Sequence, residues 1–338
     1  MKLLVFGSAN IDHVYHMPHL VREGETLSST GYSRCEGGKG LNQATALAKA
    51  GQEVSFAGAI GEDGLFLKAY LDGLGIDTAD LAVLDMPTGH AMIQVDALGN
   101  NSIVLFGGAN QAVTPDRIDA VLAHYAPGDY LLLQNEISRG DTIIRRAAAR
   151  GIRVVLNPSP MSDALLSWPL ELVDWFILNE IEGRDLTGKA VPEDMLRALL
   201  HRYPRAHVVL TLGGDGSLYA DGVQRFHQPV IPVPVVDHRG GRYLHGILSP
   251  CHPERKPGAG SALPGGARSV PCGQPSRRGA IDSLCRRSIA VYAARRPFLV
   301  RAGRCMACAP DRHFATATIS SPETVKPPSI GRQGNRRD

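Results

Sequence analysis

The chain has 338 residues, of which 43% are hydrophobic and 20% are charged, and its formal net charge is +3. This composition is typical of a globular protein with a sizeable core, in one large domain or two. It argues against a membrane partner, because no apolar run approaches the roughly 20 residues that span a bilayer. Asp12 interrupts the N-terminal apolar run too early for a secretory signal, so we expect a cytoplasmic protein.

Hydrophobic patterns along the chain predict alternating strands and helices. Residues 2–7 are expected to form a buried first strand, and 90–108 a hairpin that turns at Gly99-Asn100-Asn101. The continuous apolar run 129–135 is typical of a central parallel strand. Further strands are expected within 152–160, 173–183 and 206–217, and helices at 41–50, 141–151 (closed by Gly151) and 192–204.

Strands that alternate with helices predict a mostly parallel sheet with helices on both faces. Such sheets bind ligands beyond the carboxyl ends of their strands. The predicted strands end in loops that contain Asn, Gly, Glu or Thr. We therefore expect the chemistry of the protein at this edge of the sheet.

The stretch "GSANID", Gly7 to Asp12, follows the first strand directly. Asn10 and Asp12 would point the same way if the chain stays extended. An amide and a carboxylate at a strand end can bind sugar hydroxyls. The alternative is a pair of Asx turns that caps a loop, and it stays open at this point.

A glycine-rich loop precedes the first expected helix in "EGGKGLNQATALAKAG", residues 36–51. Glycines at 37, 38 and 40 let the backbone approach a ligand closely and direct N–H groups at an anion or at hydroxyls. Asn42 in the first helical turn would reach the same ligand. The loop is neither a Walker A motif nor a dinucleotide GxGxxG motif.

Three later loops carry polar residues after strands. Glu136 follows the central strand, and "NEIE" places Asn179 and Glu182 after another. An amide and a carboxylate three residues apart can orient metal-bound water and phosphate, although a helix capping box has the same spacing. The loop "TLGGDGS", 211–217, suits the phosphates or base of a nucleotide, with an ordinary turn as the alternative.

Taken together, the segments "GSANID", "GGKGLNQA", "GGAN", "LNPSP", "LNEIE" and "TLGGDGS" occur in the order found in the PfkB (ribokinase-like) carbohydrate kinases. The chain resembles this family, and its ribokinase branch most, over about residues 3–237. The resemblance implies a three-layer α/β/α, Rossmann-like domain with a small β lid from about 10–35 and 88–110. It also implies transfer of the ATP γ-phosphoryl group to a primary hydroxyl of a sugar, and a homodimer contact through the lid.

Site residues follow from the resemblance motif by motif. The sugar would be held by Asn10, Asp12, Gly38, Lys39, Asn42 and Glu136. The nucleotide would contact Asn179, Thr211, Gly213 and Gly216. Glu182 would organise Mg²⁺ through water, and Asp237 matches a carboxylate that helps to bind a monovalent cation such as K⁺.

The catalytic motif of the family is missing. The resemblance leads us to expect D-T-x-A-A-G-D-x-F next, with the final Asp as the base and the Gly-rich turn as an anion hole. The chain instead continues from Asp237 as H-R-G-G-R-Y-L-H-G, and no Asp or Glu follows until Glu254. No catalytic residue can therefore be assigned in this chain.

A shifted reading frame accounts for the loss. Codons exist for His238–Gly246 that yield T-A-A-G-D-T-F-T-G when they are read one base later. At the same offset, Cys285–Ser288 can be reread as A-A-A-A, and Tyr292–Arg296 as T-R-P-G-A, which resembles the Ala-rich helix and loop of the family. We interpret residues 238–338 as an out-of-frame translation, which a genuine mutation and a sequencing error would produce alike.

The composition of 238–338 agrees with this interpretation. This tail holds 18 Lys and Arg against 5 Asp and Glu, whereas 1–237 holds 18 against 28. It is rich in Arg, Pro, Gly and Cys without a period, and we expect it to be disordered. Its single helical pattern, 277–296, stands alone. Cys305 and Cys308 form half of a zinc motif, and no motif supports specific nucleic-acid binding.

The sequence thus predicts a carbohydrate kinase that uses ATP and Mg²⁺ and converts D-ribose to D-ribose 5-phosphate, with little or no activity in the chain as written. Two alternatives stay open. One is a catalytically inactive sugar-binding or regulatory protein with a basic tail. The other is a PfkB kinase for another sugar or a nucleoside, because lid contacts that motifs do not fix determine the choice of sugar.

Overall fold

The computed structural model describes residues 1–230 of the chain. Several predictions lie outside the described residues, namely the cation site at Asp237, the helical segment 277–296 and the character of the 238–338 tail. Within residues 1–230, no helix combines the length and the apolar character needed to cross a membrane.

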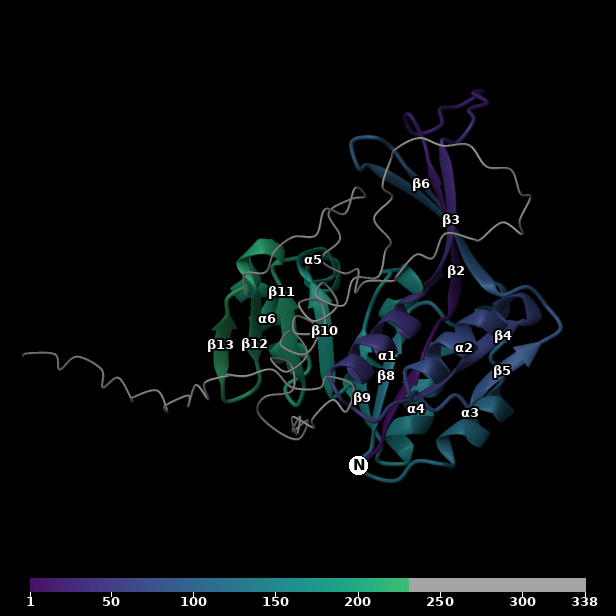
Figure 1. The fold of residues 1–338 in the computed structure, drawn as a ribbon. Coiled ribbons are helices and arrows are strands. Elements are labelled where there is room, and N and C mark those ends of the chain that lie inside the picture. Colours follow the sequence, from purple (N-terminus) through teal and green to yellow (C-terminus); the bar gives the residue numbers. More distant parts are fainter. Residues whose placement is uncertain (231–338) are drawn as a thin grey trace, which may run out of the picture. The chain divides into compact units, whose positions relative to one another are not determined.

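A nine-stranded sheet forms the centre of the described structure (Figure 1). Its strands are β1 (Leu3–Phe6), β4 (Ser55–Gly61), β5 (Leu81–Leu84), β8 (Tyr130–Gln134), β9 (Arg153–Asn157), β10 (Trp175–Asn179), β11 (His207–Thr211), β12 (Ser217–Ala220) and β13 (Arg225–Gln228). They lie in the order β13-β12-β11-β10-β9-β8-β1-β4-β5, parallel from β11 to β5 and antiparallel at the β12–β13 edge. The predicted strands all belong to this sheet or to the lid.

Helices cover both faces of the sheet, because parallel strands need crossover connections and bury both faces. They are α1 (Lys39–Lys49), α2 (Leu65–Gly73), α3 (Pro115–Leu122), α4 (Gly140–Ala149), α5 (Glu180–Thr187) and α6 (Pro192–Arg202). Leu131 and Leu133 of β8 join a core with residues of α3–α6, whereas Tyr130 and Leu132 join a second core with Leu41 of α1. The predicted three-layer α/β/α fold is confirmed.

A second sheet forms the lid. Its strands are β2 (Asn10–His16), β3 (Gly31–Gly37), β6 (Gly89–Val95) and β7 (Asn101–Phe106). They lie in the order β3-β2-β6-β7, with β2 parallel to β6 and antiparallel to β3. Because β2 follows β1 after only three residues, the first residues of the lid lie next to the carboxyl edge of the central sheet.

The hairpin of the lid turns slightly earlier than the sequence predicts. Asn101 already belongs to β7, and the turn spans Asp96 to Asn100. The Asp96 carboxylate accepts the backbone N–H groups of Leu98 and Asn100 at 2.9 and 2.8 Å. Gly99 supplies the left-handed conformation with φ 82°. The side chain of Asp96 therefore fixes the start of the turn, which propensity alone placed three residues later.

Candidate functional site

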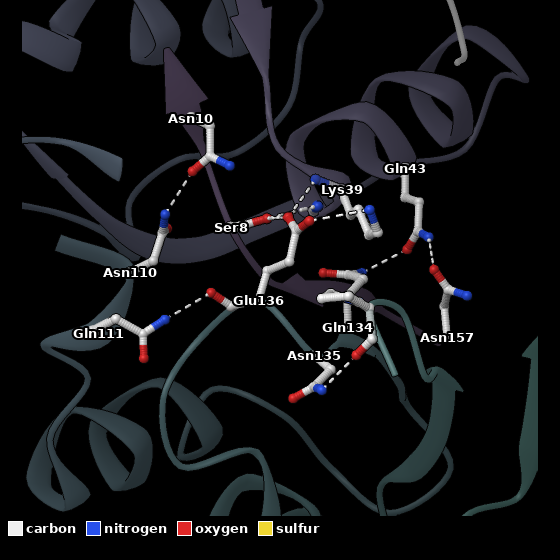
Figure 2. Close-up of polar contacts among 12 residues, drawn as sticks. Ser8, Asn10, Lys39, Gln43, Asn110, Gln111, Gln134, Asn135, Glu136 and Asn157 are labelled. Atoms are coloured by element: carbon white, nitrogen blue, oxygen red, sulfur yellow. Dashed lines mark hydrogen bonds and ion pairs between the residues drawn. The ribbon is translucent and has the colours of Figure 1, made fainter. Parts of the chain in front are cut away.

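The N-terminus of α1 binds a carboxylate of the protein itself (Figure 2). The Lys39 N–H donates to Glu136 Oε2 at 2.9 Å, and Lys39 Nζ lies 3.1 Å from Glu136 Oε1. The Ser8 hydroxyl donates to the same Oε2 and accepts the Gly40 N–H at 3.3 Å. A carboxylate is favourable at a helix N-terminus. These contacts start α1 two residues before its predicted first residue.

Loop donors that the sequence interpretation assigned to a ligand are thus taken by protein groups. Besides the Lys39 and Gly40 N–H groups, the Leu41 N–H donates to the Ser8 carbonyl at 2.9 Å. A ligand at this loop would meet the Lys39 ammonium and the Glu136 carboxylate rather than free backbone N–H groups.

Two glycines permit this close approach of the loop to β1 and β2. Gly38 has φ 92°, and a Cβ atom there would lie 2.9 Å from the Ser8 carbonyl oxygen. A Cβ atom at Gly40 would lie 2.6 Å from the Ser8 nitrogen. A side chain at either position would push α1 away from Glu136, which explains why glycine stands at both.

Asn10 is held by an asparagine that lies 100 residues later in the chain. Asn110, in the short 3₁₀ helix Gly108–Gln111, donates through Nδ2 to Asn10 Oδ1 at 2.7 Å and accepts the Ala9 N–H at 3.2 Å (Figure 2). Both side chains are buried, with residue exposures of 7% for Asn10 and 1% for Asn110. Asn110 belongs to the "GGAN" motif, but only the fold shows its partner.

Asp12 follows on β2 and packs over Gly37, where a Cβ atom would collide with its carboxylate. Burial, and after it the nearby Glu136 charge, raise the pKa of Asp12 to about 7 against the opposing effect of Lys39. Asp12 therefore titrates near neutral pH, whereas an exposed Asp is ionised there. This shift marks the junction of the two sheets as a candidate functional site.

The raised pKa of Asp12 predicts a pH-dependent stability. Its carboxyl binds a proton in the folded state up to about pH 7 and in the unfolded state only to about pH 4, so its contribution to folding falls as pH rises between these values. We expect Asp12→Asn to gain up to about 3 kcal/mol in free energy of unfolding relative to wild type between pH 5 and pH 8. Urea unfolding at both pH values measures this gain.

Asp85→Asn serves as the control, because Asp85 is an exposed carboxylate. The control is expected to follow the wild type at both pH values. A constant difference between Asp12→Asn and wild type across the pH range would contradict the assignment of the titration to Asp12.

A pocket of about 190 Å³ lies at this junction. The Gln111 amide donates to the Glu136 carbonyl at 3.1 Å, and the Asn135 amide donates to the Pro160 carbonyl at 2.6 Å. These contacts position polar groups around an apolar wall that includes Phe106 of β7. The polar side chains that line the pocket are Asn10, Asn110, Gln111, Asn135 and Glu136. Amides and a carboxylate beside an apolar wall suit a polyol, which has hydroxyl groups and C–H faces.

A chain of side-chain amides connects α1 to β8, β9 and β10 (Figure 2). Gln134 Nε2 donates to Gln43 Oε1 at 2.6 Å, and Gln43 Nε2 donates to Asn157 Oδ1 at 3.0 Å. Asn157 Nδ2 in turn donates to the Ile177 carbonyl at 2.9 Å. Neither these residues nor Ser8 were predicted as site residues, although polar residues at the ends of apolar strands point to Gln134 and Asn157.

The residues predicted to bind the nucleotide gather at the neighbouring strand ends. Asn179 ends β10 and lies opposite Thr211 at the end of β11. Gly213 and Gly216 take left-handed conformations, with φ 54° and 90°, in the turn that follows. Asn42 lies in the first turn of α1, where its N–H donates to the Gly38 carbonyl at 3.0 Å.

Asn179 and Glu182 form the capping box that the sequence left open as an alternative. The Glu182 N–H donates to Asn179 Oδ1 at 2.9 Å, and the Asn179 N–H donates to Glu182 Oε2 at 3.0 Å. Glu182 is 4% exposed. Among residues 1–230, no three His, Cys, Asp or Glu side chains cluster closely enough to hold a metal ion directly. A role of Glu182 toward Mg²⁺ stays a prediction.

The family model for pfkB family carbohydrate kinases matches residues 1–240, and the chain belongs to this family. A ribokinase from Haemophilus influenzae is 38% identical over 226 residues, which cover 63% of this chain and 72% of that protein. A bifunctional ribokinase/ribose-5-phosphate isomerase A from Fructilactobacillus sanfranciscensis is 35% identical over 247 residues. That match covers 70% of this chain but only 45% of the bifunctional protein, so the chain spans less than half of its length.

Solved structures of ribokinases share the fold. One is a ribokinase from Cryptococcus neoformans in complex with ADP, with 35% identity and a TM-score of 0.57 over 69% of this chain and 80% of that one. Another is the Arabidopsis thaliana ribokinase complexed with ribose and ATP, with 31% identity and a TM-score of 0.59 over 70% and 80%.

Proposed function

We propose that residues 1–230 provide most of the sugar site and part of the nucleotide site of an ATP-dependent kinase that phosphorylates a primary hydroxyl of D-ribose. One observation carries the proposal. Asn10, Asp12, Lys39 and Glu136, from three separate segments, meet beside a polar pocket at the junction of the lid and the central sheet. The relative complexed with ribose and ATP supports the choice of sugar.

The proposed sugar contacts follow from the donors and acceptors of the site. Asp12 and Glu136 offer carboxylate oxygens, while Asn10, Asn42 and Lys39 offer N–H donors. A furanose hydroxyl can donate to one carboxylate oxygen and accept from one N–H group. Gly38 permits the loop to approach because it has no side chain. The pocket of about 190 Å³ lies beside these groups.

The proposed nucleotide site lies at the ends of β10 and β11. Asn179 would face the phosphates of ATP, and Thr211, Gly213 and Gly216 would line the nucleotide. Relatives solved with ADP and with ATP support the binding of a nucleotide. Mg²⁺ prefers substrate phosphates and water over an all-protein cage, so Glu182 would act on it through water. The K⁺ role of Asp237 lies outside the described residues.

The activity of the chain as written is a separate question. The family resemblance places the base a few residues after Asp237, but no carboxylate follows Asp237 until Glu254. This observation favours a second candidate function, a sugar-binding protein without catalysis.

We also propose a cytoplasmic homodimer that pairs through the lid, since Val104, Leu105 and Phe106 of β7 are at least half exposed.

Calorimetric titration of the 338-residue chain with D-ribose tests the sugar site. We expect saturable binding of D-ribose, and weaker binding of D-glucose because the pocket is small. The matched variant Asn10→Ala is expected to lose most of the signal. Absence of saturable heat with any sugar from a folded protein would contradict the proposed site.

A further inference from the structure

We propose that Asn110 is a positioning residue that fixes the Asn10 amide with its NH₂ group toward the pocket. The site would then present a hydrogen-bond donor at Asn10 and select an acceptor oxygen of the ligand. The identity of that ligand as a sugar rests on the proposed function, whereas the orientation of Asn10 does not.

The orientation follows from the backbone. The Ala9 N–H can only donate, so the Asn110 side chain must turn its oxygen toward it, at 3.2 Å. The Asn110 NH₂ group then donates to Asn10 Oδ1 at 2.7 Å and, more weakly, to the Ala9 carbonyl at 3.5 Å. Since the Asn10 oxygen is used, its nitrogen is the free end of the pair. Figure 2 shows this nitrogen pointing away from Asn110.

Burial makes the reverse arrangement unfavourable. Asn110 is 1% exposed and Asn10 is 7% exposed. A flipped Asn110 would set its NH₂ group against the Ala9 N–H and its oxygen against the Asn10 oxygen. Buried polar groups left without partners in this way are rare in folded proteins. Within residues 1–230, the Asn10 nitrogen donates to no protein acceptor, and Asn10 lines the pocket.

Gly89, the first residue of β6, closes the other side of this pair. A Cβ atom at Gly89 would lie 2.1 Å from Asn110 Nδ2 and 2.6 Å from Asn10 Oδ1. No side chain fits there while the hydrogen bond exists. A side chain at Gly89 of the lid would therefore disturb the orientation of Asn10. Substitution of Gly89 can break the hydrogen bond between Asn110 and Asn10 without adding a charge.

Side-chain amide exchange tests the orientation in the full chain. The protein is labelled with ¹⁵N-asparagine, and Asn10→Asp and Asn110→Asp assign the two NH₂ signals. We expect the Asn110 NH₂ group to exchange with solvent at least about tenfold more slowly than that of Asn10, because it is hydrogen-bonded and buried. Faster exchange at Asn110 than at Asn10 would overturn the proposal.

Asn110→Asp gives a sharper test. The introduced carboxylate accepts the Ala9 N–H but cannot donate to Asn10. We expect the Asn10 amide to flip and donate to it, so that exchange of the Asn10 NH₂ group slows at least about tenfold. Unchanged Asn10 exchange in a folded variant would overturn the proposal.

Gly89→Ala tests the same contact with a neutral change. We expect exchange of the Asn110 NH₂ group to accelerate about tenfold or more, while Gly73→Ala, at a helical glycine with open space around its Cβ, leaves it unchanged. Unaltered exchange in a folded Gly89→Ala protein would contradict the role of Asn110.

Titration with D-ribose separates the two proposals. If wild type binds ribose, we expect Asn110→Asp and Gly89→Ala to bind it about tenfold more weakly, with Gly73→Ala unchanged. Equal affinity of all four proteins would overturn the selection of an acceptor oxygen. If wild type binds no sugar but the exchange pattern holds, the proposed sugar function fails and the orientation of Asn10 by Asn110 stands.

Discussion

Insertion of two bases between codons 237 and 238 is expected to raise the rate of D-ribose phosphorylation at least about 10⁴-fold over the chain as written. The insertion would bring T-A-A-G-D-T-F into frame and supply both a base and an anion hole. A general base contributes about 10²–10⁴ in rate, and removal of a single oxyanion donor costs about 10²–10³. A coupled assay of ADP release from purified protein measures the ratio.

The design of this comparison separates loss of catalysis from loss of fold. In the restored protein, replacement by Asn of the aspartate recovered across Arg242-Tyr243 should return the rate to that of the chain as written. Sugar titration of both proteins shows whether the site persists without the motif. Equal turnover by the written and restored chains would refute the frame interpretation.

Glu136→Gln is expected to weaken D-ribose binding at least about 30-fold, a loss of roughly 2 kcal/mol. The variant loses the charge that pairs with Lys39 at 3.1 Å. Its new NH₂ group must also face a donor, because the Ser8 hydroxyl and the Lys39 N–H both donate to Glu136 Oε2. We expect the free energy of unfolding to fall as well, on the order of 2 kcal/mol, because buried donors lose their acceptor.

Glu53→Gln is the matched control, since Glu53 is an exposed carboxylate in a loop. It should leave both affinity and unfolding unchanged. A Glu136→Gln protein with wild-type affinity would show that the carboxylate holds α1 without serving the ligand. Wild-type stability together with lost affinity would instead assign Glu136 to the ligand alone.

Sequence patterns alone predicted β1, β8, β9, β10, β11, α1, α4, α6 and the family, but they missed β4, β5, α2 and α3. Hydrophobic periodicity is a local property, so β8 and α4 could be predicted from neighbouring residues. The motifs predicted that Asn10, Lys39 and Glu136 belong to one site. The absence of the catalytic motif after Asp237 is likewise known from the sequence only, because this region lies outside the described residues.

Tertiary structure decided which groups satisfy one another. Ser8 and Glu136 are 128 residues apart, and Ala9 and Asn110 are 101 apart, so no local pattern could pair them. The same packing determined that α1 begins at Lys39, against a carboxylate of the protein itself. It also raised the pKa of Asp12 to about 7, because burial and the Glu136 charge exist only once the lid meets the sheet. Sequence supplies the chemical groups, but hydrogen-bond direction and desolvation depend on what folding places beside them.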